Sequence, residues 1–317
     1  MDQPTPTSRE LTDDFRIAKD SLGKVRVPAT ALWGAQTQRA IENFPISGIR
    51  FGRRFVAALG HVKRACTLSN MGLGTLDAAL GGPILQACDE MIAGELDAHF
   101  PIDIFQTGSG TSTNMNANEV LANRANRILD EMRSADKRKV HPNDHVNRSQ
   151  SSNDVIPTVA HVALTLALRE DLIPSLEHLA EALEVKAEAF DGVVKTGRTH
   201  LQDATPIRMG QVFGGFAAQA RHSVARALQA MAAVRELPLG GTAVGTGLNC
   251  PLGFPAKAIE HLNAALNGEF AEAANHVEAN AARDGLVEAS GLLKTIAVSL
   301  HKIANDIRWM ASGPRNG

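Results

Sequence analysis

The sequence predicts a mainly α-helical protein, a bundle of long helices with a small mixed domain at the N-terminus. From residue 53 onward apolar residues recur at helical spacing, whereas strand signals are sparse. The 317 residues are 44% hydrophobic and 21% charged, which is ordinary for a globular chain with a sizeable core. We expect an N-terminal domain at 1–140 and a central helical-bundle domain at 141–317, divided by a charged stretch near residue 140.

The first half of the chain contains the one clear strand signal and three shorter helices. Lys24–Pro28 alternates and ends in proline, as a short strand does. Residues 54–69 and 83–98 have amphipathic helical patterns. Thr113–Met132 follows a glycine-serine loop and is expected to be a helix capped by hydroxyls. Residues 1–10 are polar and contain prolines, so we expect a loose arm there.

The second half predicts three long helices. The first starts near Pro157, in its first turn, and is expected to bend at Pro174. The second runs from near Met209 to Val234. The third carries a heptad in two registers: Leu286, Leu293, Leu300 and Ile307, and Ala289, Ile296 and Ile303. Such a register indicates bundle packing at coiled-coil-like angles. Helices this long need neighbours to cover them, which favours a homo-oligomer.

Composition excludes several classes of protein. A net charge of −2 gives no reason to expect a nucleic-acid or membrane partner, and no apolar run is long enough to span a bilayer. The three cysteines are widely spaced, so neither a disulfide framework nor a zinc site is expected. The N-terminus lacks the apolar core of a secretory signal. We therefore expect a reduced, cytoplasmic location.

Four polar segments stand out in this alanine-rich chain, at 107–119, 141–144, 149–154 and 197–203. They are rich in small hydroxyls, amides and glycine, or in turn-forming residues, and none has the apolar periodicity of core. Together they are typical of a pocket for a small anion. Metal binding is not expected, because no second histidine or carboxylate stands at ligand spacing around His200.

Each segment also has a plainer explanation. Thr107–Thr111 can form an anion cradle of backbone N–H groups or a simple capping turn, and the segment alone does not favour either interpretation. The amides that follow it, with Glu119, can line a pocket or be a weakly capped first turn. Ser151–Asn153 precedes a long helix, where capping and anion binding use the same geometry. His141–Asp144 is foremost a turn.

The fourth polar segment and one glycine-rich loop complete the candidates. His200, in Gly197–Asp203, has the polar neighbourhood expected of a general base, unlike the histidines within helical pattern. The glycine-rich Leu239–Asn249 is expected to be a tight connection between helices, with a contribution to a pocket in another subunit as the alternative.

The four segments match, in order, the substrate segments of class II fumarases, in the fumarase/aspartase superfamily. Further matches lie at Asp20–Gly23, Gly34–Arg39, Glu42–Pro45, Asn305–Trp309 and Ser312–Arg315, so the resemblance covers nearly the whole chain. It implies a long-helix bundle shared by four subunits, with sites built from three of them. It also implies reversible hydration of fumarate to L-malate without a metal or organic cofactor.

The resemblance assigns roles to individual residues. Those expected to hold the substrate carboxylates are Ser109, Gly110, Thr111, Ser151, Ser152, Asn153 and Thr199. His200 would orient or activate water, and a secondary anion site would comprise His141, Pro142, Asn143 and Asp144. Removing a proton beside a carboxylate builds a dianionic aci-carboxylate, which such donors would stabilise.

One departure from the family pattern affects the expected activity, and two alternatives stay open. The family's signature serine loop, and the glutamate that pairs with the histidine, would lie beyond Gly317, so we expect this chain to be inactive or nearly so by itself. The alternatives are an aspartase-like ammonia lyase, which ammonia release from L-aspartate would identify, and a non-catalytic bundle scaffold. Aspartases typically carry Ser-Thr-Asn where this chain has Ser151–Asn153, and they lack the Thr199–His200 pair.

Overall fold

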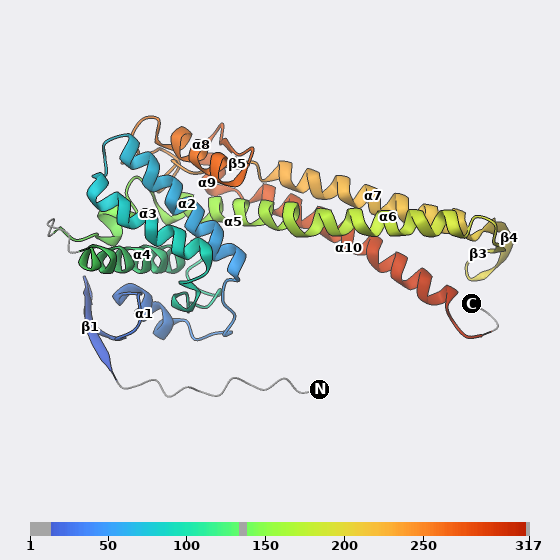
Figure 1. Ribbon diagram of the computed structural model, residues 1–317, viewed down its shortest axis with the longest axis horizontal. Helices are drawn as coiled ribbons and strands as arrows, with labels where there is room; N and C mark the ends of the chain where they lie inside the picture. The colour runs from blue at the N-terminus through green and yellow to red at the C-terminus, as the bar shows by residue number, and fades with distance from the viewer. Residues whose placement is uncertain (1–13, 133–137, 315–317) are drawn as a thin grey trace. The chain divides into compact units, whose positions relative to one another are not determined.

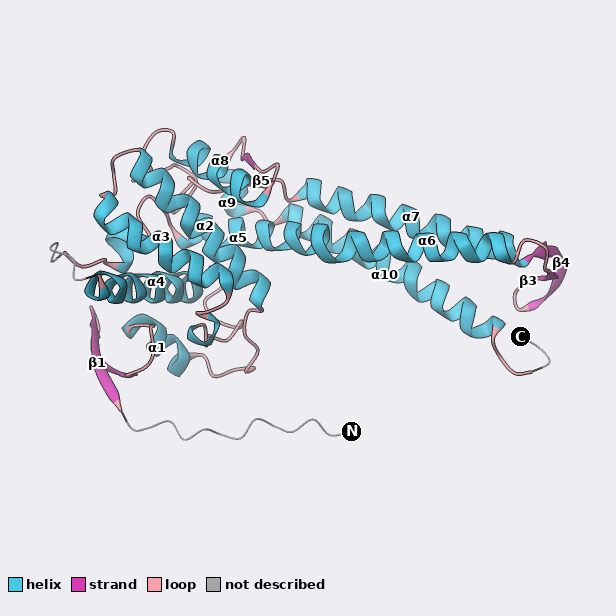
Figure 2. Ribbon diagram, in the orientation of Figure 1, coloured by secondary structure: helices cyan, strands magenta, loops and turns pink. Residues whose placement is uncertain are grey.

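The computed structural model describes residues 14–132 and 138–314, and helices dominate it (Figures 1 and 2). The chain forms two compact units. The first takes in Met1–Val159 and Pro238–Asn280, and the second Ala160–Leu237 and Ala281–Gly317. The expected arm at 1–10 and most of the charged stretch near residue 135 lie outside the described residues. The predicted domain boundary at 140 stays a prediction; the compact units divide after Val159.

The first unit begins with an antiparallel hairpin, β1 (Phe15–Asp20) and β2 (Gly23–Pro28), in which Asp20 pairs with Gly23 at the turn. Its helices and short elements are α1 (Ala35–Asn43), α2 (Arg53–Gly72), α3 (Ala78–Ala93), η1 (Asp97–His99), α4 (Thr111–Glu131), η2 (Pro142–Val146), α8 (Phe254–Leu266), β6 (Ala271–Glu272) and α9 (His276–Ala281). α2 packs against α3 and α8, and α3 packs against α4. The buried side chains include Leu59, Ile84, Leu121, Phe254 and Leu262.

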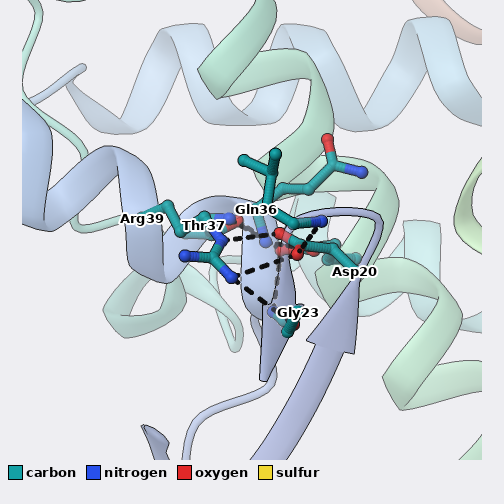
Figure 3. Close-up of polar contacts among 8 residues, drawn as sticks. Asp20, Gly23, Gln36, Thr37 and Arg39 are labelled. Carbon is teal, nitrogen blue, oxygen red and sulfur yellow. Dashed lines mark hydrogen bonds and ion pairs between the residues drawn. The ribbon is translucent and has the colours of Figure 1, made fainter. Parts of the chain in front are cut away.

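Two charged contacts hold α1 in this unit. Arg39 donates to both carboxylate oxygens of Asp20 at 2.8 and 3.2 Å and to the Gly23 carbonyl, which fastens α1 to the hairpin turn (Figure 3). The buried Glu119 carboxylate of α4 accepts the first backbone N–H groups of α1, those of Gly34, Gln36 and Thr37, at 2.8–3.0 Å. Glu119 therefore caps a helix remote in sequence, which satisfies donors that the helix itself cannot.

The second unit is built from three long helices. α5 (Ser152–Ala167) enters it and continues through the π-helical turn η3 (Leu168–Leu172) into α6 (Ile173–Ala189). The hairpin of β3 (Val194–Thr199) and β4 (Gln202–Arg208) leads into α7 (Met209–Ala233), which returns beside α6 (Figure 1). The strand β5 (Glu236–Leu237) follows, and α10 (Asp284–Met310) packs against α7.

Two apolar clusters hold these helices together. One contains Leu176, Ala230 and Ile296 with their neighbours, and the other contains Leu183, Phe216 and Ile303. On α10 the buried register is Ala289, Ile296 and Ile303, whereas the leucine register is only partly buried. The predicted heptad therefore packs through the register of Ala289, Ile296 and Ile303.

The long helices and the mainly helical class are confirmed. Pro174 lies at the start of α6, directly after the π-helical turn η3, so the helix is irregular near the position where a bend was predicted. Three details differ from the expectations. Pro157 is not in the first turn, because α5 begins at Ser152. α3 begins five residues before the predicted start at 83, with Asp77 accepting from Ala79 N–H, and ends before Gly94. The β3–β4 hairpin was not predicted.

Candidate anion-binding site

α4 begins immediately after Gly110, whose backbone is left-handed with φ 68°. Ser109 Oγ and Thr111 Oγ1 lie 2.9 Å apart on the exposed side of this turn. The prediction that hydroxyls cap this helix is wrong, because the N-cap residue is Gly110, which has no side chain. Gln106 Oε1 instead accepts the Thr113 N–H at 2.9 Å. The hydroxyls of Ser109 and Thr111 are therefore not needed to cap the helix.

α5 begins with Ser152, and the residue before it serves as a cap. Ser151 Oγ accepts the Asn153 N–H at 3.3 Å, while Ser151 N–H donates to Asp154 Oδ1 at 2.9 Å. The capping interpretation of Ser151 is thus correct in part. All three residues of the Ser151–Asn153 segment keep some exposure to solvent.

Two contacts bring the starts of α4 and α5 together. Asn114 Nδ2 on α4 donates to Ser152 Oγ on α5 at 3.0 Å. A Cβ on Gly110 would lie 2.9 Å from Ile156 Cγ2, so the absence of a side chain lets α5 approach the turn before α4 near its start. Two helix N-termini, each with small hydroxyls, therefore lie beside each other, and the positive ends of both helices favour an anion there.

Asp154 holds a third segment against this pair. It is fully buried and its Oδ2 accepts the backbone N–H groups of Gly240 and Thr242 at 3.0 and 2.9 Å. Asn153 Nδ2 donates to the Ala243 carbonyl at 2.8 Å. Burial raises the pKa of Asp154, against the opposing effect of its hydrogen bonds and of Lys63. The glycine-rich loop thus packs on the α5 start of its own chain.

Behind the first turn of α4 lies a buried ammonium group. Lys63 on α2 is 0% exposed, and its Nζ donates to Asn147 Oδ1 and Gln150 Oε1, both at 3.0 Å. Asn147 Oδ1 also accepts from Asn114 Nδ2 at 3.2 Å. Burial lowers the pKa of Lys63 to about 8. Sequence reasoning missed this lysine, because it lies in an ordinary amphipathic helix pattern.

The other amides of α4 do not form the expected pocket wall. Asn116 and Asn118 are buried, and their Nδ2 groups donate to the His99 carbonyl and to Met115 Sδ. Glu119 binds the start of α1, as described above. Among these side chains, Asn114 is the one that contacts Ser152.

His141 precedes the short π-helical turn η2, which contains Pro142, Asn143 and Asp144, and the segment is largely exposed. His141 Nδ1 lies 3.0 Å from Asp144 Oδ2 and accepts the Asp144 N–H at 3.3 Å. His145 Nδ1 accepts the His141 N–H at 2.8 Å, and burial lowers the pKa of His145, which suits a neutral acceptor. The turn interpretation is confirmed, and the secondary anion site at His141, Pro142, Asn143 and Asp144 stays a prediction.

Thr199 and His200 belong to the second unit, where they stand at the end of the β3–β4 hairpin. Thr199 pairs with Gln202, and both intervening residues, His200 and Leu201, have positive φ values of 53° and 60°. Such a turn ordinarily requires glycine or asparagine, so the backbone is strained here. Both side chains are exposed to solvent. Strain of this kind is concentrated at functional sites.

Within residues 14–132 and 138–314, no three histidine, cysteine or carboxylate side chains are grouped as metal ligands would be. In the same part of the chain, no helix combines the length and apolar content that crossing a bilayer requires.

Comparison with known proteins gives concordant results. Residues 23–317 match the sequence model of a family described as lyase. The class II fumarate hydratase of Halobacterium salinarum is 59% identical over 97% of this chain and 65% of its own length, and the mitochondrial fumarate hydratase of Saccharomyces cerevisiae is 48% identical over 98% and 63%. The chain thus spans about two thirds of the length of these relatives.

Solved structures agree with the sequence matches. The class II fumarase of Schistosoma mansoni superposes with a TM-score of 0.92 at 38% identity, covering 96% of this chain and 67% of that one. The fumarate lyase:delta crystallin of Brucella melitensis bound to cobalt gives 0.90 at 43% identity, covering 96% and 66%. The chain therefore belongs to this lyase family, and the relatives it resembles within it are class II fumarate hydratases.

Proposed function

We propose that the protein is a fumarate hydratase that adds water reversibly to fumarate, giving L-malate. The observation that carries the proposal is the pair of helix N-termini at α4 and α5, joined by the bond between Asn114 and Ser152 and furnished with small hydroxyls. The fumarate hydratases among its relatives support the same substrate.

In this proposal the residues divide into two roles. The substrate carboxylates are held by Ser109, Gly110, Thr111, Ser151, Ser152, Asn153 and Thr199. His200 orients or activates the water. Hydroxyl and N–H donors aimed at one carboxylate stabilise the aci-carboxylate that forms when the neighbouring carbon loses its proton in the dehydration direction. His141, Pro142, Asn143 and Asp144 form a secondary anion site on the surface.

The proposal extends to assembly and location. Exposed apolar side chains on the helices of the second unit, among them Leu228, Val287 and Val298, support a homotetramer whose subunits share active sites. A cytoplasmic location is the simplest one for this chain, although the yeast relative is named as mitochondrial.

A substrate panel tests the proposed reaction. The complete gene product is supplied with fumarate, L-malate or L-aspartate, and fumarate absorbance and ammonia are followed. Interconversion of fumarate and L-malate without ammonia release is expected. Ammonia release from L-aspartate would identify an ammonia lyase, and a folded protein inert toward all three compounds would support a scaffold.

A further inference from the structure

Lys63 is the one fully buried lysine in the described chain, and its charge is not used by any role assigned so far. Its Nζ donates to two neutral amide oxygens, on Asn147 and Gln150. The carboxylate that influences its charge is that of Asp154, which accepts hydrogen bonds from backbone N–H groups. A buried cation without a direct counter-ion is costly to maintain, which suggests that it serves the site.

The ammonium group fixes the direction of a chain of hydrogen bonds. Lysine Nζ is only a donor when charged, so Asn147 must present its oxygen to it. That oxygen also receives the Asn114 amide nitrogen, at 3.2 Å, so Asn114 must present its NH₂ group on this side. The same NH₂ group donates to Ser152 Oγ at 3.0 Å.

This arrangement leaves two observable consequences. Asn114 Oδ1 is buried without a hydrogen-bond partner, so the amide orientation is imposed against its own preference. Ser152 Oγ already accepts a bond from inside the protein, which leaves its O–H free to donate outward. A hydroxyl used in this way suits an anionic oxygen.

We propose that Lys63 is a positioning residue of the carboxylate pocket, which acts through Asn147 and Asn114 to make the Ser152 hydroxyl a donor toward the substrate and adds a buried positive charge that favours a dianion. This inference rests on the proposed function, because it takes a dicarboxylate as the ligand at Ser152. The groups that influence the charge of Lys63 are Cys66 on its own helix, Cys88 on α3 and Asp154 on α5.

The inference predicts a pH dependence of dianion binding. Burial raises the pKa of both thiols, that of Cys88 to about 12, so neither ionises near pH 8, where Lys63 does. If binding requires the ammonium form, affinity falls about tenfold between roughly pH 7 and pH 9. The loss occurs as the pH rises, because deprotonation removes the charge.

The test measures the Kd of succinate, a dicarboxylate that cannot be hydrated, by calorimetry on the complete gene product. Wild type should lose about tenfold in affinity between roughly pH 7 and pH 9. Lys63→Met should bind about tenfold more weakly near pH 7 and show no such dependence. Lys257→Met, which alters an exposed lysine on α8, is the matched control and should behave as wild type.

Two more variants keep the inference open to refutation if Lys63→Met fails to fold. Lys63→Arg keeps a donor-only cation that stays charged, so its affinity should be flat over this pH range. Asn147→Leu keeps the charge but interrupts the hydrogen-bond chain, and its effect should be smaller in a Lys63→Met background than alone. A Lys63→Arg variant that still loses tenfold would overturn the inference.

The outcomes also separate this inference from the proposed function. A wild type that neither hydrates fumarate nor binds succinate contradicts both. An active wild type whose folded Lys63→Met variant binds succinate with unchanged Kd and unchanged pH dependence contradicts the role of Lys63 alone.

Discussion

Asp154 joins the first turn of α5 to a loop more than eighty residues later in the chain. Its carboxylate accepts N–H groups from Ser151, Gly240 and Thr242. The sequence pointed to the neighbouring hydroxyls and amide at 151–153, because small polar residues before a helix are a local signal. Nothing local indicates which distant backbone a buried carboxylate will hold, so Asp154 and Lys63 became evident only in the structure.

Asp103 is a second carboxylate that accepts several backbone N–H groups, and its case can be measured. Burial by itself raises the pKa of Asp103, but hydrogen bonds from Phe105, Ser47 and Gly48 outweigh it and lower the pKa to about 2. The unfolded value is about 4, so its stabilising effect is present above pH 4 and is lost as the pH falls toward 2.

We therefore expect Asp103→Asn to lower the urea midpoint at neutral pH and to lose less of that midpoint than wild type between about pH 5 and pH 2.5. Glu260→Gln, which alters an exposed carboxylate on α8, is the control. An Asp103→Asn midpoint that falls with acid as steeply as that of wild type would show that the carboxylate is not responsible.

At the scale of elements, the close approach of α5 to the turn before α4 depends on Gly110. Its φ of 68° disfavours any other residue, and an added Cβ would meet Ile156 Cγ2 at 2.9 Å. Gly110→Ala should therefore lower the free energy of unfolding by about 1–3 kcal/mol and reduce fumarate turnover. Chemical denaturation and an activity assay measure the two effects.

Gly82→Ala provides the matched control for this change. Gly82 lies within α3 with no atom near the position of an added Cβ, so alanine should stabilise the helix by about 0.5–1 kcal/mol. If the contact is responsible, Gly110→Ala should cost less in an Ile156→Ala background, because that change removes both Cγ atoms that an added Cβ would meet. Equal effects of alanine at 82 and 110 would contradict the packing argument.

The long helices were predictable from sequence, and the hairpin was not. α7 matches its expected range to within a residue, because apolar periodicity over seven turns is a strong signal. β3 and β4 are exposed over most of their length, so no alternation of apolar and polar residues identifies them. α3 begins at Ala78, five residues before the predicted start at 83, and Pro83 lies inside the helix.

At the scale of the whole molecule, the second unit presents apolar side chains that its own helices do not cover. Val287 and Val298 on α10 are 69% and 62% exposed. They are eleven residues apart, which is close to three helical turns, so they lie on the same face of the helix. We expect Val287→Asp with Val298→Asp to reduce the mass of the assembly in analytical ultracentrifugation and, because the proposed sites are shared, to reduce activity.

Leu22→Asp is the control for that double variant, since it places the same charge on a 78% exposed residue of the β1–β2 turn. The control should keep the wild-type mass. A double variant that also keeps it would exclude this face of α10 from the subunit interface.

The measurement that tests the central claim most directly is the rate of L-malate formation from fumarate by the complete gene product and by Ser152→Ala. Removing one pre-aligned donor to a developing oxyanion should lower kcat by about 10²–10³-fold. Ser175→Ala, which removes a hydroxyl of α6 that donates to the Asp171 carbonyl of η3, should leave the rate unchanged. A wild type that forms no L-malate, or a Ser152→Ala variant as fast as wild type, would contradict the account.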